Sequence, residues 1–151
     1  MQKQSEHFIA LWKEARTRFA NQLDEIKEKD LLKKLGDSPN SLGFLIRHIA
    51  EVELLFAKNV FGNKDIKVSA QTVIKKEDTG EWTDLEALKS IAEEAYNALN
   101  GILEKQTDED WESTVETQEF GKKTKAEAFG RIVSHTAYHA GQMKIINKYG
   151  K

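Results

Sequence analysis

Four segments of the chain repeat their apolar residues at spacings of three and four, which is the period of an amphipathic α-helix. The first segment, residues 4–30, carries the stripe Phe8, Trp12, Ala15, Phe19, Leu23 and Ile26. The same spacing predicts helices over residues 39–61, 83–106 and 124–149. Four such helices in a chain of 151 residues predict one domain, residues 1–151, with an all-α fold of the four-helix-bundle type.

Capping signals mark where three of these helices begin. Ser38 precedes Pro39 and has the character of an N-cap, while Thr83–Glu86 and Thr124–Glu127 each match the capping-box pattern. Residues 62–82 show no helical period. This connection between the second and third helices is long enough to run the length of a bundle, so a strict up-down-up-down order is not required. Residues 107–123 predict a short hairpin or an irregular cover.

Three of the four histidines fall on apolar helical stripes. His48 lies on the stripe of the second helix, and His135 and His139 lie four residues apart on that of the fourth helix. One inward histidine is usually a hydrogen-bonded core residue. Three neutral imidazoles without partners would leave several ring nitrogens unsatisfied, at about 1–3 kcal/mol each, whereas one divalent cation binds three at once. The pattern therefore predicts a three-histidine metal site with coordination positions left open, as catalytic sites have.

Two common metal motifs do not match these letters. The zincin pattern His-Glu-x-x-His needs a glutamate where this chain has Thr136. Di-iron bundles need a glutamate three residues before the histidine, and the residues at that position are Leu45, Ile132 and Thr136. Of the metal sites considered, a mononuclear site with three histidine ligands is the one that the sequence still allows.

Two polar residues lie one helical turn beyond a predicted ligand. Glu51 follows His48 and Gln142 follows His139, each by three residues, so either side chain is a candidate for orienting a ligand imidazole. The alternatives are that Glu51 is a solvated surface residue and that Gln142 is a helix amide bonded to a neighbour. Both interpretations stay open from the sequence.

Other residues have a structural and a functional interpretation. The three tryptophans fit core or cover positions or the walls of a pocket, and Tyr138 is expected to pack against the first helix or a dimer mate. Arg47 and Arg131 are either surface residues or partners for an anionic substrate group. His7 has no predicted partner and is left outside the site.

Charge and composition exclude several classes of partner. The net charge is −2 and lysine and glutamate are interspersed, so the chain offers no basic face for nucleic acid. Its apolar runs are far shorter than the ~20 residues that span a bilayer, and the first residues show no signal-peptide core, so we expect no membrane contact and a cytoplasmic protein. Because there is no cysteine, disulfides, thiolate metal ligands and a cysteine nucleophile are excluded, and any chemistry must come from histidines, carboxylates, hydroxyls or a bound cofactor.

The segments from Ser41 to Glu51 and from His135 to Met143 resemble the DinB-like family of bacterial bundle metalloproteins, and the similarity covers nearly the whole chain. The resemblance implies an up-up-down-down bundle, often a homodimer, in which His48, His135 and His139 hold one divalent ion, zinc or nickel. Related members with an assigned activity are transferases or isomerases that use a low-molecular-weight thiol such as bacillithiol or mycothiol. It thus implies a metal-dependent enzyme of thiol-transferase type that acts on a small-molecule substrate.

Three alternatives to a thiol transferase stay open at this stage. The first is a metal-dependent hydrolase, in which a bound hydroxide is the nucleophile. The second is a non-catalytic dimer that binds a metal or small ligand, and the third is a metal-free bundle with a histidine-lined core. The sequence names no catalytic base near His135 and no substrate.

Overall fold

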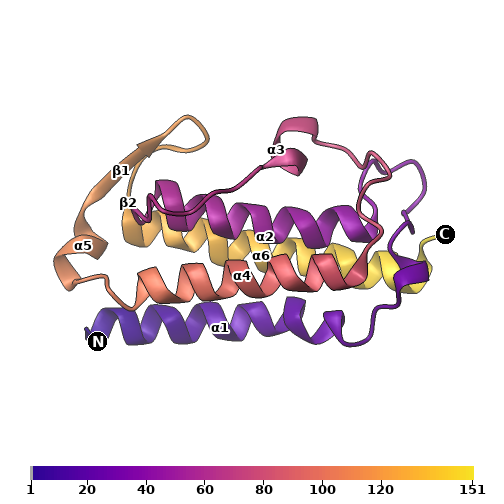
Figure 1. Cartoon of the computed structure of the whole chain (residues 1–151). Helices are drawn as coiled ribbons and strands as arrows, with labels where there is room; N and C mark the ends of the chain where they lie inside the picture. The colour runs from indigo at the N-terminus through magenta and orange to yellow at the C-terminus, as the bar shows by residue number, and fades with distance from the viewer. Residues whose placement is uncertain (1) are drawn as a thin grey trace.

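The computed structural model describes residues 2–151 and contains four long helices that lie side by side (Figure 1). They are α1 (Lys3–Leu23), α2 (Leu42–Asn59), α4 (Leu85–Leu103) and α6 (Lys125–Tyr149). Each helix buries an apolar stripe against its neighbours, as the spacing of three and four predicts. The expected all-α four-helix bundle is confirmed.

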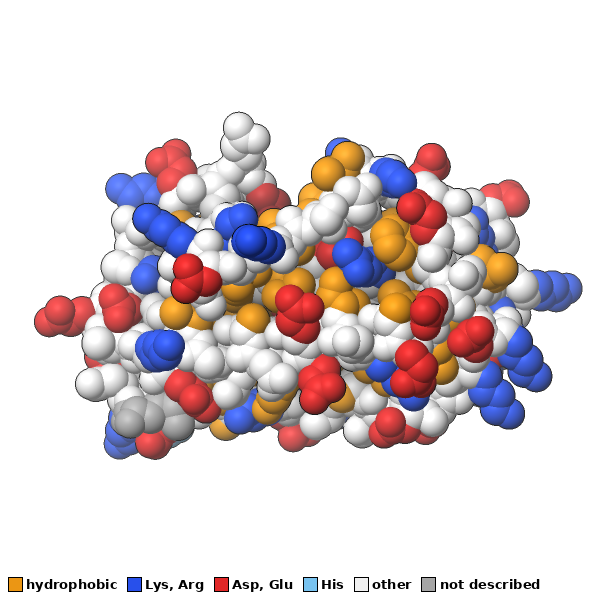
Figure 2. Space-filling model, in the orientation of Figure 1, with side chains coloured by type: hydrophobic (Ala, Val, Ile, Leu, Met, Phe, Trp, Pro, Cys, Tyr) orange, Lys and Arg blue, Asp and Glu red, His pale blue; other side chains and the backbone are white. Residues whose placement is uncertain are grey.

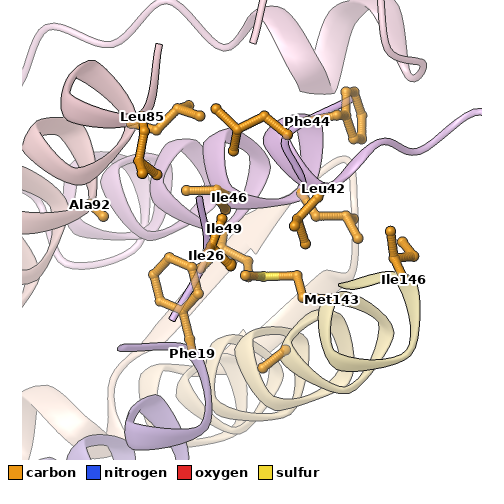
Figure 3. Packing of buried hydrophobic residues seen from close by; sticks show 14 residues of the cluster. Phe19, Ile26, Leu42, Phe44, Ile46, Ile49, Leu85, Ala92, Met143 and Ile146 are labelled. Carbon is orange, nitrogen blue, oxygen red and sulfur yellow. The ribbon is translucent and has the colours of Figure 1, made fainter. Parts of the chain in front are cut away.

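Two groups of buried residues show the directions of the helices. One group joins the end of α1 to the start of α2 and α4 and the end of α6, and includes Phe19, Ile49, Ala92 and Met143 (Figure 3). The other joins the start of α1 to the far ends of α2 and α4 and the start of α6. The order is therefore up-down-down-up, and the up-up-down-down order implied by the family resemblance is wrong.

The connections between the helices explain this order. Residues 24–41 stay at one end of the bundle, so α2 returns antiparallel to α1. Residues 60–84 run back along α2 before α4 begins, so α2 and α4 are parallel (Figure 1). The prediction of a long crossover between the second and third helices is confirmed, and this crossover contains a short helix, α3 (Gln71–Lys75), that the sequence did not indicate.

The first helix is shorter than its apolar stripe. It ends at Leu23 rather than near residue 30, and a single 3-10 turn, η1 (Glu28–Asp30), follows. Ile26 is 4% exposed and Leu31 is fully buried, so the chain keeps entering the core after the helix has ended. The residues after Leu23 extend the apolar pattern because they are buried in the turn that follows the helix. Periodicity alone does not distinguish such a buried turn from a longer helix.

Hydrogen bonds at the helix starts correct two of the predicted caps. The hydroxyl of Ser41, not Ser38, caps α2 by accepting the backbone N–H of Phe44 in its first turn. Asp84, not Thr83, caps α4. The capping box at Thr124 is confirmed, since its side chain and that of the glutamate three residues later each accept a backbone N–H.

A small cover closes one end of the bundle between α4 and α6. It consists of α5 (Asp108–Glu112) and an antiparallel hairpin of β1 (Thr114–Thr117) and β2 (Gly121–Thr124), in the register Thr114 opposite Thr124. Of the two alternatives expected for residues 107–123, the hairpin is confirmed for residues 114–124, whereas residues 108–112 form a short helix that was not expected. Acidic and basic side chains are interspersed on the face that carries this hairpin and α3 (Figure 2). Within residues 2–151, no helix combines the length and apolarity needed to cross a membrane.

Candidate metal centre

The three predicted histidines come together between α2 and α6. His48 lies near the middle of α2, and His135 and His139 lie on successive turns of α6. One ring nitrogen from each falls within 4.8 Å of the other two, and Nε2 of His48 is 3.1 Å from Nε2 of His135. This group could hold a metal ion.

The group lies at the edge of the core rather than at its centre. Ile132, Thr136, Ala140 and Met143 form the fully buried side of α6, and the histidines lie beside this side, each half-buried. The expectation that all three face the core is therefore only partly right. Their place at the edge leaves room for a ligand to approach.

A side chain from the crossover contacts the ring of His48. Oγ1 of Thr72, on α3, lies 3.0 Å from Nδ1 of His48 and also hydrogen-bonds to the carboxylate of Glu51. Thr72 is 1% exposed, so no bulk water competes for these contacts. The short helix α3 thus brings Glu51 and His48 into one hydrogen-bonded chain. Sequence reasoning missed Thr72 because no local pattern marks it.

Glu51 is a buried residue that anchors the crossover. Its side chain is fully buried and accepts the backbone N–H groups of Gln71 and Thr72, the hydroxyl of Thr72 and Nε of Arg47. The interpretation of Glu51 as a solvated surface residue is therefore wrong, because the sequence did not show that residues 60–84 cover this side of α2. Through Thr72, Glu51 reaches the ring of His48.

This chain of hydrogen bonds fixes the tautomer of His48. A carboxylate only accepts hydrogen bonds, so the single hydroxyl hydrogen of Thr72 goes to Glu51. Thr72 must then accept a hydrogen from Nδ1 of His48, which leaves Nε2 of that ring with a free lone pair. The free nitrogen is the one that faces His135.

Gln142 plays the corresponding part for His139. Its Oε1 lies 2.7 Å from Nδ1 of His139, so Nδ1–H donates to the amide oxygen and Nε2 is left free. Nδ1 of His135 is buried and has no hydrogen-bond partner within the described part of the chain. Two of the three rings are thus held by a neighbouring oxygen.

Burial keeps the three rings in the neutral form that metal binding requires. Burial, followed by the charge of His139, lowers the pKa of His48 from 6.5 to about 4. Burial, the two other histidines and Arg131 lower the pKa of His135 to about 3. Burial also lowers the pKa of His139, although its bond to Gln142 opposes the shift.

Two separate hollows reach the histidine group, each of about 300 Å³. The first is bordered by His135 and lies between α2, α6 and the hairpin turn. The second is bordered by His48 and His139 and lies between α2, α6 and α3. The group can therefore be approached from two sides.

The remaining candidate residues lie outside the histidine group. Trp12 and Trp111 are fully buried, as core or cover residues are, while Trp82 is half-buried under the guanidinium of Arg47. Tyr138 is 65% exposed with its ring 5.1 Å from that of His139, so it does not pack against α1. The exposed His7 lies far along α1 from the site.

Comparison with known families agrees with this architecture. The family model of the DinB superfamily matches residues 11–143, which include all three histidines. No curated protein matches the chain. Because the match spans most of the sequence and both ligand-bearing helices, the chain belongs to the DinB superfamily.

Proposed function

We propose that the protein is a metal-dependent enzyme of thiol-transferase type, with His48, His135 and His139 as the ligands of one divalent ion, zinc or nickel. The observation that carries the proposal is the convergence of one ring nitrogen from each of the three histidines, with Nε2 left free on His48 and on His139. Thr72 and Gln142 occupy Nδ1 of His48 and His139, so the Nε2 lone pairs are left for a cation. Ligand histidines in metal sites are oriented in this way by oxygen acceptors.

The spacing of the nitrogens fits a transition-metal ion. Two imidazole nitrogens bound to a tetrahedral ion at ~2.0–2.1 Å lie roughly 3.3 Å apart. Nε2 of His48 and Nε2 of His135 are 3.1 Å apart. Without a cation, the lone pair on Nε2 of His48 would need a hydrogen from Nε2 of His135.

Two hollows support transfer between two organic molecules more than hydrolysis. A hydrolase needs one substrate and water, whereas a transferase binds a donor and an acceptor at the same centre. The hollow beside His135 and the hollow beside His48 and His139 offer a place for each. A bound cation would lower the pKa of a thiol held in either hollow and so favour the thiolate.

The chain has to take its sulfur nucleophile from another molecule. It contains no cysteine, so no side chain can supply a thiolate. Thr136, which follows His135, is fully buried and its hydroxyl has no partner among the described residues, so it does not act as a base toward a bound water. These features support an external thiol over a hydroxide generated by a neighbouring base.

Metal analysis of the purified protein tests the first half of the proposal. We expect one divalent ion per chain in the wild type, and loss of the ion in His48→Ala and in His135→Ala, because two ligands hold it too weakly. His7→Ala is the matched control and should keep the ion, since His7 is exposed and away from the group. A wild type that takes up no ion from zinc or nickel solutions contradicts the proposal.

A spectroscopic titration tests the thiol. The protein is loaded with cobalt(II), whose absorption reports thiolate binding, and titrated with 2-mercaptoethanol or, as the control, ethylene glycol. We expect a thiolate-to-metal charge-transfer band with the thiol alone. A spectrum that does not change would contradict thiol use and leave hydrolysis by a metal-bound hydroxide as the remaining enzymatic function.

A further inference from the structure

Arg131 lies at the mouth of the hollow that His135 borders. The two residues are four apart on α6, so their side chains leave the same face of the helix about one turn from each other. Arg131 and His135 both line the hollow between α2, α6 and the hairpin turn. Arg131 thus belongs to the approach to the histidine group.

The charge of Arg131 is only weakly satisfied inside the protein. Among residues 2–151, its ion-pair partner is Glu119 on the hairpin turn, at 3.7 Å between NH2 and Oε1, with side chains 46% and 62% exposed. A pair of such length and exposure contributes little to stability, so the guanidinium can exchange partners. The ring of Phe120, 5.6 Å away, packs near the guanidinium and limits its movement.

The hollow itself combines this charge with apolar walls. Val52 and Phe56 on α2 form one side, and the exposed ring of Tyr138 stands at the other. We propose that this hollow is a binding subsite for a small carboxylate with a short apolar body, in which Arg131 holds the carboxylate. The inference rests on the proposed function, because a ligand held in this way points its other end at His135 and the metal centre.

A carboxylate fits this subsite better than a phosphate. A guanidinium presents two parallel N–H groups that match the two oxygens of a carboxylate. Only one arginine lines the hollow, and Glu119 adds a negative charge to its rim. One guanidinium offsets the single charge of a carboxylate, whereas the two charges of a phosphate would be left partly uncompensated beside Glu119.

Binding of butyrate to the metal-free protein tests the subsite. Butyrate has a carboxylate on a short apolar chain, and butyramide has the same shape without the charge. We expect butyrate to shift the NMR signals of the Ser134 and Tyr138 amides at millimolar concentration, and butyramide to bind at least tenfold more weakly. Arg131→Gln should weaken butyrate binding at least tenfold, whereas Arg18→Gln, an exposed arginine on α1, should leave it unchanged.

A second variant gives a gain that misfolding does not produce. Glu119→Gln removes the competing carboxylate, so we expect butyrate to bind about two- to fivefold more tightly. Butyrate binding that is equal in the wild type and Arg131→Gln would overturn the proposal. So would binding only to the metal-loaded protein, since the ion and not Arg131 would then hold the carboxylate, and this result would leave the proposed function intact. Butyrate binding that depends on Arg131, in a protein that takes up no metal, would support the subsite and contradict the metal-dependent function alone.

Discussion

Thr72 and His48 are 24 residues apart in the sequence, yet the hydroxyl oxygen of Thr72 lies 3.0 Å from Nδ1 of His48. The contact exists because residues 60–84 return along α2 and place α3 against it. Glu51 holds α3 in place through two backbone N–H groups. The orientation of one candidate ligand therefore depends on a segment that belongs to none of the four main helices.

Thr72→Val should weaken metal binding without removing a ligand. Valine has nearly the shape of threonine but no hydroxyl, so His48 loses the acceptor that fixes its tautomer. Losses of 10–100-fold in affinity are typical for residues that orient a ligand histidine. Competition with a chromophoric chelator measures the affinity, and Thr72→Ser, which keeps the hydroxyl, should stay within a few-fold of the wild type. Equal affinity in the valine variant would show that Thr72 does not orient His48.

The lowered pKa values of the histidines predict how the metal-free protein responds to acid. The pKa values in the folded protein are about 4 for His48 and about 3 for His135, below the ordinary 6.5. At pH values between 6.5 and these lowered values, the folded protein therefore binds fewer protons than the unfolded chain. Stability is therefore fully present above pH 6.5 and is lost as the pH falls through 6 and 5 toward 4. Urea unfolding at a series of pH values measures this loss.

His135→Gln provides the control for that pH dependence. Glutamine does not titrate near neutral pH, so the slope of the free energy of unfolding against pH should become shallower by up to about 1.4 kcal/mol per pH unit below 6.5. The variant of the exposed residue, His7→Gln, should keep the wild-type slope. A slope that is the same in His135→Gln and the wild type would mean that His135 titrates normally in the folded protein.

The sequence predicted local features of the structure well and long-range features poorly. Helix stripes and the capping box at Thr124 depend on spacing within a few residues, and these were confirmed. The histidine group was predicted because two of its members share one helix face. The role of Thr72 and the burial of Glu51 could not be predicted, because they depend on where the crossover of residues 60–84 lies, and that segment carries no periodic pattern. The up-up-down-down order implied by the family resemblance was wrong for a related reason, since the path of the connections sets the direction of each helix. Homodimer formation stays a prediction.

Gly43 lies where α2 meets the end of the crossover, and Gly43→Ala should destabilise the fold. A Cβ at this position would overlap the backbone oxygen of Trp82 and lie only 3.1 Å from its Cβ. Backbone cannot yield as a flexible side chain does, so we expect a loss of about 1–3 kcal/mol in the free energy of unfolding. Gly130→Ala, at an open helical position, is the control and should raise stability by about 0.5–1 kcal/mol. Thermal unfolding of both variants measures the difference, and a neutral Gly43→Ala would show that the close approach to Trp82 relaxes at little cost.

The buried ion pair between Arg16 and Glu53 makes a prediction about the core. Nε of Arg16 lies 2.9 Å from Oε2 of Glu53, and its NH2 donates to the carbonyl of Ala92 on α4. Burial raises the pKa of Glu53 although Arg16 opposes the shift. Arg16→Met leaves this carboxyl group without a partner, so we expect a loss of about 3–5 kcal/mol in the free energy of unfolding.

The double variant Arg16→Met, Glu53→Leu separates the charge from the packing. It removes both partners, so much of the stability lost in Arg16→Met should return. Denaturant unfolding of the two single variants and the double variant completes the cycle. Losses that simply add would show that the two side chains contribute independently.

The two buried carboxylates of α2 also hold the candidate ligand His48 in position. Glu51 and Glu53 are both fully buried, and two residues of separation place them on nearly opposite sides of the helix. Glu51 is bonded to the crossover and Glu53 to α1, so any rotation of α2 about its axis would break one of these attachments. His48 is thus held in position by the protein alone. A cation bound as we propose would cost little conformational entropy, because a preorganised site gains affinity from the rigidity of its scaffold.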